Sequence, residues 1–194
     1  MLKPPKKLFL ALAIFMSVMV VLSNFLVQFP VKFFNLDKIL TYGAFSYPVT
    51  FLITDLANRA YGKIQARKIV YLGFLLGISL TFYFSTNLKD IISIRIAVGS
   101  GTAFLIAQLL DVQVFDRLRR KAWFVAPLAS SLLGSFVDTI LFFFISFYKT
   151  GIPWLSLALG DFSVKILIAL IMLIPFRLFL NRIKDSGSGH LKVT

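Results

Sequence analysis

Residues 123–148 read WFVAPLASSLLGSFVDTILFFFISFY, and Asp138 is the only charged residue in this run. The hydrocarbon core of a bilayer is about 30 Å thick, and roughly 20 apolar residues in a helix cross it. A helix of a water-soluble protein usually keeps one polar face along its length. This run has no such face, so it indicates a transmembrane helix.

The same pattern recurs along the chain. Stretches of similar length and apolar content cover residues 8–29, 40–61, 69–88, 94–115 and 152–176. Lipid cannot satisfy an open backbone, so each stretch is predicted to be helical. The sequence therefore predicts an all-α polytopic membrane protein, a six-transmembrane-helix bundle forming one domain over residues 1–183. Residues 184–194 contain Ser-Gly repeats typical of linkers and are predicted to form a disordered polar tail.

The charge distribution indicates how the bundle is oriented. Of the 194 residues, 58% are hydrophobic, and 21 Lys and Arg against eight acidic residues give a net charge of +13. Fifteen basic residues fall at the two termini and in the loops after the second and fourth stretches, whereas four fall in the opposite loops. The positive-inside rule then predicts that both termini are cytoplasmic. Anionic lipid headgroups explain this pattern without a nucleic-acid partner.

The residue types present exclude several kinds of site. The chain has no cysteine, and its single histidine, His190, lies in the polar tail. Disulfides, thiolate ligands and histidine-based metal centres are therefore excluded. We expect no metal and no cofactor.

Charged side chains inside the apolar stretches are the strongest functional signal. Four of the eight acidic residues lie there, namely Asp55, Asp111, Asp138 and Asp161. Each costs about 2.5–3.5 kcal/mol at the centre of a bilayer, so such residues face the bundle interior, a partner or a wet cavity. Asp138 has no charged neighbour on its own helix. It must find a partner on another helix or hold a proton, which makes it the leading functional candidate.

Sequence spacing suggests partners for the other three aspartates. Asp161 and Lys165 are four residues apart on one helical face, as are Asp55 and Arg59, so both pairs can form ion pairs. We expect the second pair to be structural. Arg117 is close enough in sequence to approach Asp111.

Uncharged polar residues complete a candidate binding site. A carboxylate can accept two parallel hydrogen bonds from the edge of a guanine-type base, while an amide or a lysine serves the neighbouring carbonyl. Aromatic rings can stack on such a base, although amino acids or organic cations would also suit the site. The predicted substrate-binding residues are Asn24, Gln28, Asp55, Gln108, Asp111, Asp138, Asp161 and Lys165.

Several short motifs resemble those of one family. They include Ser23-Asn24-Phe25-Leu26-Val27-Gln28, Gly43-Ala44-Phe45-Ser46-Tyr47-Pro48, Phe51-Leu52-Ile53-Thr54-Asp55-Leu56, Gln108-Leu109-Leu110-Asp111-Val112, Asp138-Thr139 and Asp161 with Lys165. Together they run over nearly the whole chain, which resembles the queuosine-precursor transporters, or vitamin uptake transporter family. The resemblance implies a bacterial inner-membrane importer, not an enzyme, for 7-cyano-7-deazaguanine or its aminomethyl relative. It leaves the choice of substrate open, because Asn58 and Arg59 stand where members often have an acidic residue.

The mechanism expected for such a protein is alternating access around a site near the middle of the membrane. The first three and last three helices have opposite polarity and can form inverted repeats. Pro48 lies inside the second stretch and is expected to kink or break it. Asp138 or Asp161 can carry a coupled proton, although facilitated diffusion is an equal alternative. The expected partners are a small 7-deazaguanine and the bilayer, with the chain acting alone or as a homodimer.

Two other functions are compatible with parts of the sequence. A substrate-binding subunit of an energy-coupled vitamin importer also has six helices, but it needs ATPase partners. The first stretch lacks a small-residue docking motif, because Ala11 and Ala13 are two residues apart rather than four. An intramembrane aspartyl protease would use Leu159-Gly160-Asp161 as half of its signature, and the Tyr-Asp half is missing.

Overall fold

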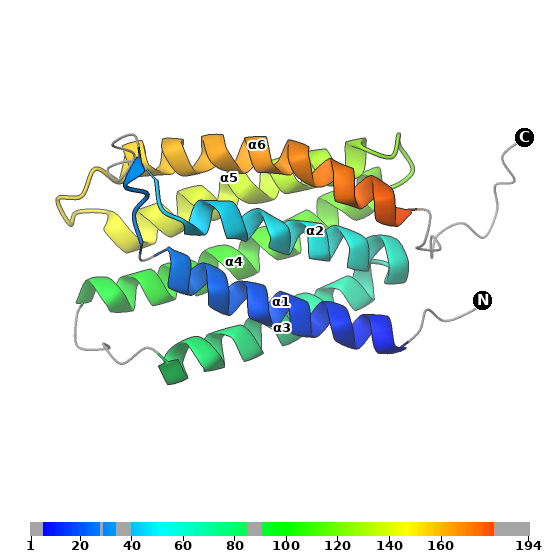
Figure 1. The fold of residues 1–194 in the computed structure, drawn as a ribbon, viewed down its shortest axis with the longest axis horizontal. Coiled ribbons are helices and arrows are strands. Elements are labelled where there is room, and N and C mark those ends of the chain that lie inside the picture. Colours follow the sequence, from blue (N-terminus) through cyan, green and yellow to red (C-terminus); the bar gives the residue numbers. More distant parts are fainter. Residues whose placement is uncertain (1–5, 28, 34–39, 85–90, 181–194) are drawn as a thin grey trace, which may run out of the picture.

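The structure is a computed structural model that describes residues 6–27, 29–33, 40–84 and 91–180. These residues form six α-helices, which run antiparallel along one axis (Figure 1). The helices are α1 Lys6–Leu26, α2 Gly43–Tyr61, α3 Lys63–Phe84, α4 Ile91–Leu118, α5 Val125–Phe147 and α6 Trp154–Leu180. The all-α prediction and the six predicted helices are confirmed. The predicted tail at 184–194 lies outside the described residues.

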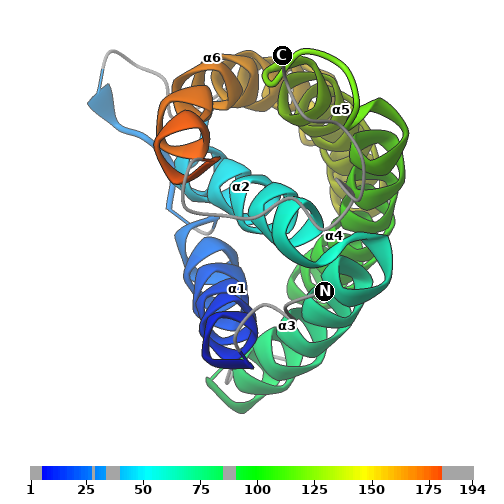
Figure 2. The ribbon, with the colours of Figure 1, turned by 90° about the vertical axis from the view of Figure 1, so that its right-hand side faces the viewer.

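Helix α2 occupies the centre of the bundle. It contacts each of the other five helices, which surround it in the view along the bundle (Figure 2). Its sequence suits this place, because Ser46, Thr50, Thr54 and Asn58 follow one another at intervals of four and form a polar stripe. All four are buried. The interior of the bundle is therefore polar along α2.

The outer surface of the bundle is apolar. Leu10 and Ile14 of α1 are 60% and 53% exposed, and Leu167 and Ile174 of α6 are 60% and 64% exposed. Large exposed aliphatic faces of this kind are rare on soluble monomers. Four helices, α1, α4, α5 and α6, are long and apolar enough to cross a membrane. The polar stripe of α2 and the basic start of α3 lower the hydropathy of the other two.

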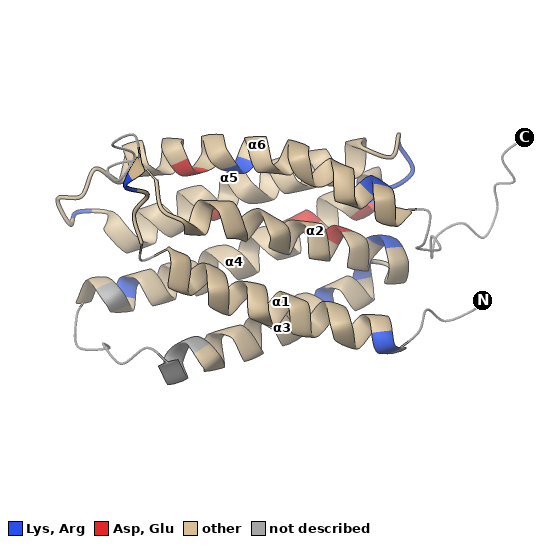
Figure 3. Ribbon diagram, in the orientation of Figure 1, with Lys and Arg blue, Asp and Glu red and all other residues tan. Residues whose placement is uncertain are grey.

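The two ends of the bundle differ in charge. The first turn of α1 and the last turn of α6 lie at the same end (Figure 1). Basic residues are concentrated at that end, and few charges lie along the middle of the bundle (Figure 3). This arrangement agrees with the asymmetry counted in the sequence. We call this end the basic end.

Pro48 does not break α2, so that part of the prediction is wrong. The helix runs without interruption from Gly43 to Tyr61. Side-chain hydroxyl groups flank the proline and donate to backbone carbonyls, from Ser46 to Gly43 at 3.2 Å and from Thr50 to Tyr47 at 2.6 Å. Hydroxyl groups of this kind compensate a proline inside a membrane helix.

Close packing joins α2 to α5. A Cβ on Gly134 would lie 2.5 Å from the Phe51 ring, so only glycine permits this approach. Helix α2, which carries Asp55, is the second of the first three helices, and α5, which carries Asp138, is the second of the last three. Their contact brings the polar residues of both halves together.

Candidate solute-binding site

A buried three-residue ion cluster lies between α5 and α6. Lys165 Nζ lies 2.8 Å from Asp138 Oδ2 and 2.6 Å from Asp161 Oδ2. All three residues are at most 6% exposed. Thr139 accepts a hydrogen bond from Lys165 at 3.1 Å and donates one to Asp161 at 2.8 Å. We refer to Asp138, Asp161 and Lys165 as the lysine cluster.

The lysine cluster confirms two expectations from the sequence. Asp161 and Lys165 form the ion pair that their spacing predicted. Asp138 finds a partner on another helix, as its isolation on its own helix required. The cluster holds two carboxylates and one ammonium group, so it carries one more negative than positive charge when all three are ionised.

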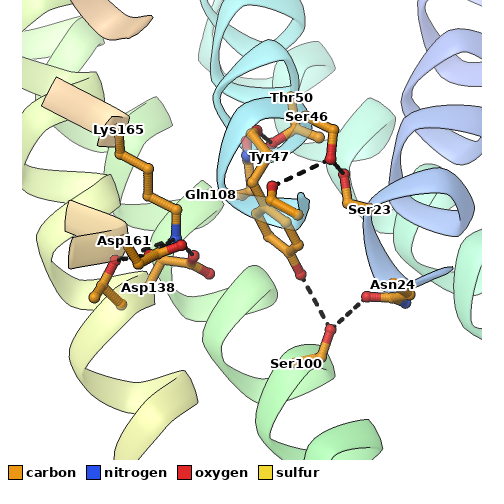
Figure 4. A network of polar contacts seen from close by, with 12 residues as sticks. Ser23, Asn24, Ser46, Tyr47, Thr50, Ser100, Gln108, Asp138, Asp161 and Lys165 are labelled. Atoms are coloured by element: carbon orange, nitrogen blue, oxygen red, sulfur yellow. Dashed lines mark hydrogen bonds and ion pairs between the residues drawn. The ribbon is translucent and has the colours of Figure 1, made fainter. Parts of the chain in front are cut away.

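Tyr47 of α2 faces the lysine cluster (Figure 4). The Lys165 ammonium lies 5.3 Å from the centre of the Tyr47 ring, within the range of a cation–π contact. The Tyr47 hydroxyl bonds to Ser100 of α4 at 3.1 Å, and Ser100 donates to Asn24 of α1 at 2.5 Å. A polar chain therefore runs from α6 through α2 and α4 to α1.

Gln108 of α4 also forms hydrogen bonds with α2. Its Nε2 donates to Thr50 at 2.7 Å, and its Oε1 accepts from Thr54. Gln108 is completely buried. These contacts fix the register of α4 against α2.

A second pair of aspartates lies nearer the basic end. Asp55 of α2 accepts hydrogen bonds from Ser130 at 3.1 Å and from Ser131 at 3.3 Å, both on α5. Asp111 of α4 lies within hydrogen-bonding reach of Asp55. Both Asp111 carboxylate oxygens are buried, and neither makes a hydrogen bond of good geometry among the described residues, although the Ser130 hydroxyl lies near Asp111 as well as Asp55. We refer to Asp55 and Asp111 as the aspartate pair.

A small cavity adjoins the aspartate pair. Its walls are formed by Pro48, Leu52, Asp55, Pro127, Ser131, Ala169, Met172, Leu173 and Phe176. It has room for about one water molecule. The cavity reaches from Asp55 towards α6, so α2, α5 and α6 all border it.

The two sites lie at different depths in the bundle. At about 1.5 Å per residue, Ser130 is about 8 Å from the start of α5 at the basic end, and Asp138 is about 20 Å from it. The lysine cluster is therefore near the middle of the bundle, and the aspartate pair lies about 10 Å closer to the basic end.

Two predicted pairings need correction. Arg59 donates from Nη1 to the backbone carbonyl of Arg119 at 3.0 Å, while Asp55 is engaged by the two serines. Carbonyls near the end of a helix lack partners within that helix and attract an arginine. Arg117 is exposed, whereas Asp111 is completely buried and lies against Asp55. Gln28 lies outside the described residues.

Sequence reasoning missed several residues at these sites. Tyr47, Thr50 and Thr54 were not among the predicted binding residues, although the spacing of four along α2 was readable. Ser130 and Ser131 were not among the predicted binding residues either, and the structure shows that both donate hydrogen bonds to Asp55. Within the described residues, no group of three His, Cys, Asp or Glu side chains could hold a metal ion.

Comparison with known proteins decides the family. A family model described as a vitamin uptake transporter matches residues 41–180, which include α2 to α6. The chain belongs to the vitamin uptake transporter family. Both the lysine cluster and the aspartate pair lie within the matched region of this family member. Transport, rather than an enzymatic reaction, is the activity of the family, as predicted.

Three curated relatives extend the match. The chain is 32% identical to the "Queuosine precursor transporter" of Escherichia coli over 91% of its own length and 90% of that protein. It is 35% identical to the "Probable queuosine precursor transporter" of Haemophilus influenzae, over 70% and 66% of the two chains. A protein with the same description from Bacillus subtilis is 30% identical, over 79% and 76%. No solved structure matches. This vitamin uptake transporter is thus a multi-pass membrane protein of a bacterial transporter family.

Proposed function

We propose that the chain imports a 7-deazaguanine queuosine precursor across the bacterial inner membrane for queuosine synthesis in tRNA. All six helices cross the membrane, and the basic end faces the cytoplasm. The similarity to queuosine precursor transporters over 91% of the chain is the observation that carries this proposal. The fifteen-to-four distribution of basic residues supports the orientation.

The solute binds at the lysine cluster, against the ring of Tyr47. The carboxylate of Asp138 accepts hydrogen bonds from the ring N–H and the exocyclic amine of the base. Lys165 donates to the neighbouring ring carbonyl, and Tyr47 stacks on the base. These three side chains combine the acceptor, the donor and the aromatic face that a guanine-type base requires.

The polar groups of the lysine cluster are partners for one another. Lys165 Nζ lies 2.8 Å from Asp138 Oδ2. When the base binds, the direct contact between Lys165 and Asp138 is replaced by hydrogen bonds from each side chain to the edge of the base. The two side chains therefore have polar partners with and without the base. Polar groups buried without partners would be costly, and this exchange avoids that cost.

The other predicted site residues have supporting roles. Asp161 keeps Lys165 in place at 2.6 Å when Asp138 turns to the solute. Gln108 and Asn24 are held by hydroxyl groups of neighbouring helices and border the route to the lysine cluster. We propose that Gln28 borders the same route. The nitrile base is the primary substrate, with the aminomethyl base as a second substrate.

Complementation tests the function. The chain is expressed in a bacterium that can neither make nor import the precursor, and the nitrile base, the aminomethyl base or queuine is supplied separately. Queuosine in tRNA is then measured. We expect the nitrile base to restore the modification, and the aminomethyl base to do so less efficiently.

Two variants test whether uptake depends on Asp138. Asp138→Asn is expected to abolish uptake, because the amide cannot accept two hydrogen bonds as a carboxylate does. Asp116→Asn makes the same change at a surface residue that pairs with Arg119 at 3.4 Å, and it should leave uptake unchanged. No restoration by any base, with the protein correctly inserted, would refute the proposal. Uptake that depends on an added ATPase would favour the importer-subunit alternative.

A further inference from the structure

The two carboxylates of the aspartate pair have unequal surroundings. Asp55 is 2% exposed and receives two hydrogen bonds from serines. Asp111 is 0% exposed, and neither of its oxygens makes a hydrogen bond of good geometry among the described residues, although the Ser130 hydroxyl lies near it as well as near Asp55. An ionised carboxylate without a hydrogen bond of good geometry, buried against a second carboxylate, is strongly unfavourable. A proton on Asp111 removes this problem, because the protonated group donates to Asp55.

Among the described residues, the basic side chains of the neighbouring helices contact groups other than the aspartate pair. Arg67 of α3 donates to Gln113 at 3.2 Å, and Arg119 of α4 donates to the carbonyls of Asn58 and Arg59. Arg59 of α2 donates to the carbonyl of Arg119. Lys165 of α6 is held in the lysine cluster. Helix α5 contributes only serine hydroxyl groups.

We propose that Asp111 binds a proton shared with Asp55, and that this proton moves with the solute and drives its uptake. The inference rests on the proposed transport function and adds its energy source. The sequence analysis gave Asp138 or Asp161 as the carrier of a coupled proton, with facilitated diffusion as an equal alternative. In the structure the Lys165 ammonium contacts both of these carboxylates, whereas the aspartate pair has no such cation among the described residues.

The chemistry of the pair favours a proton over a metal cation. The hydroxyl groups of Ser130 and Ser131 lie 3.1 and 3.3 Å from Asp55, where they can donate to a carboxylate, and Ser130 Oγ also lies 3.3 Å from the Pro127 carbonyl. A sodium ion would need these oxygens to turn their lone pairs inward and would need further oxygen ligands. The adjoining cavity has room for about one water, which is too little for a hydrated ion.

The position of the pair explains how a proton and a solute can be coupled. Helices α2 and α5 carry groups of both sites, with Tyr47 and Asp138 at the lysine cluster and Asp55 and Ser131 at the aspartate pair. Loss of the proton places two negative charges between α2 and α4. The repulsion separates these helices near the basic end and admits water from the cytoplasm. The protonated pair closes that end.

Transport by purified protein in liposomes tests the inference with the neutral nitrile base as solute. Counterflow of labelled against unlabelled base reports solute binding and exchange without a net driving force. Accumulation under an inward proton gradient reports coupling, with the membrane potential clamped. A gradient of one pH unit supports about tenfold accumulation for one proton per solute. We expect wild-type protein to approach this ratio and to ignore a sodium gradient.

Asp111→Asn is the informative variant. Its amide can donate to Asp55 as a protonated carboxyl does, so counterflow should stay within about threefold of wild type. Accumulation should fall to simple equilibration, because no proton is carried. Asp116→Asn should accumulate solute like wild type. Asp138→Asn should lose counterflow itself.

Several results would overturn the inference. Wild-type counterflow without a response to the proton gradient, accumulation that follows sodium, or normal accumulation by Asp111→Asn would each refute proton coupling while leaving transport intact. Absence of wild-type counterflow would refute the proposed function and this inference with it. If Asp111→Asn does not insert, solute-induced uptake of protons by the wild type decides, since a coupled transporter must make the external medium more alkaline.

Discussion

Replacement of Lys165 by methionine is the substitution whose effect on stability can be predicted most directly from the structure. Lys165 is 3% exposed and contacts two carboxylates, at 2.8 and 2.6 Å. Methionine keeps most of the side-chain length and removes the charge. Removing one partner of a buried ion pair typically costs about 3–5 kcal/mol. Because a chain of this size loses about 2–4 °C per kcal/mol, the midpoint of thermal unfolding should fall by about 6–20 °C.

Asp138→Asn should be far milder, although it removes a charge from the same cluster. It leaves Lys165 with Asp161 at 2.6 Å, so one positive and one negative charge remain. The asparagine oxygen can still accept a hydrogen bond from the ammonium. One charge-assisted hydrogen bond is weakened, which corresponds to about 1–1.5 kcal/mol or a shift of no more than about 5 °C. This variant should therefore stay folded while it loses uptake.

Thermal unfolding in detergent, followed by size-exclusion chromatography, measures both effects. Lys68→Met makes the same substitution on the exposed surface of α3 and serves as the control. The triple variant Lys165→Met, Asp138→Asn and Asp161→Asn removes all three charges and should regain more than half of the loss. A midpoint for Lys165→Met within about 2 °C of the control would refute the view that Lys165 stabilises both carboxylates.

Three further predictions follow from the packing and the charges. Gln108→Leu removes the partner of the Thr50 and Thr54 hydroxyl groups and should lower the free energy of unfolding by about 1–3 kcal/mol, as measured by thermal unfolding. Gly134→Ala should destabilise by about 1–3 kcal/mol, because its Cβ would lie 2.5 Å from the Phe51 ring, and no loss would show that α2 and α5 are farther apart. The chain has no cysteine, so single variants can report topology. An impermeant maleimide applied from outside should label Thr150→Cys but not Lys121→Cys in intact cells, and the reverse result would invert the proposed orientation.

The number of helices and their approximate bounds were predictable because each apolar run is long and separated from the next by polar residues. The Asp161–Lys165 pair was also predictable, since a spacing of four fixes two side chains on one helical face. The same rule failed for Asp55 and Arg59. Spacing says which side chains can meet, and it does not say which competing partner on another helix is nearer. Here Ser130, Ser131 and the carbonyl of Arg119 were those partners.

The partner of Asp138 could not be predicted, for a related reason. The sequence shows that this residue has no charged neighbour on its own helix, and it cannot show that Lys165 of α6 reaches it. The sequence likewise treated Asp111 as one of four similar aspartates. Only the packing of α4 against α2 reveals that, in the described part of the chain, its carboxylate lies against Asp55 and makes no hydrogen bond of good geometry. The difference between a balanced and an unbalanced buried acid is a tertiary property.

A coupled transporter must bind its solute and its driving proton, and these two tasks need buried acids with different surroundings. A group that binds solute must offer polar atoms that can change partners without leaving a charge alone, and the lysine cluster does this through its internal ion pairs. A group that binds a driving proton must be energetically unfavourable in its deprotonated form, because only then does release of the proton force the helices to move. The aspartate pair meets that condition, and α2 and α5 join it to the lysine cluster about 10 Å away. With the proposed assignment, the chain links a neutral solute to a proton without letting the two compete for one carboxylate.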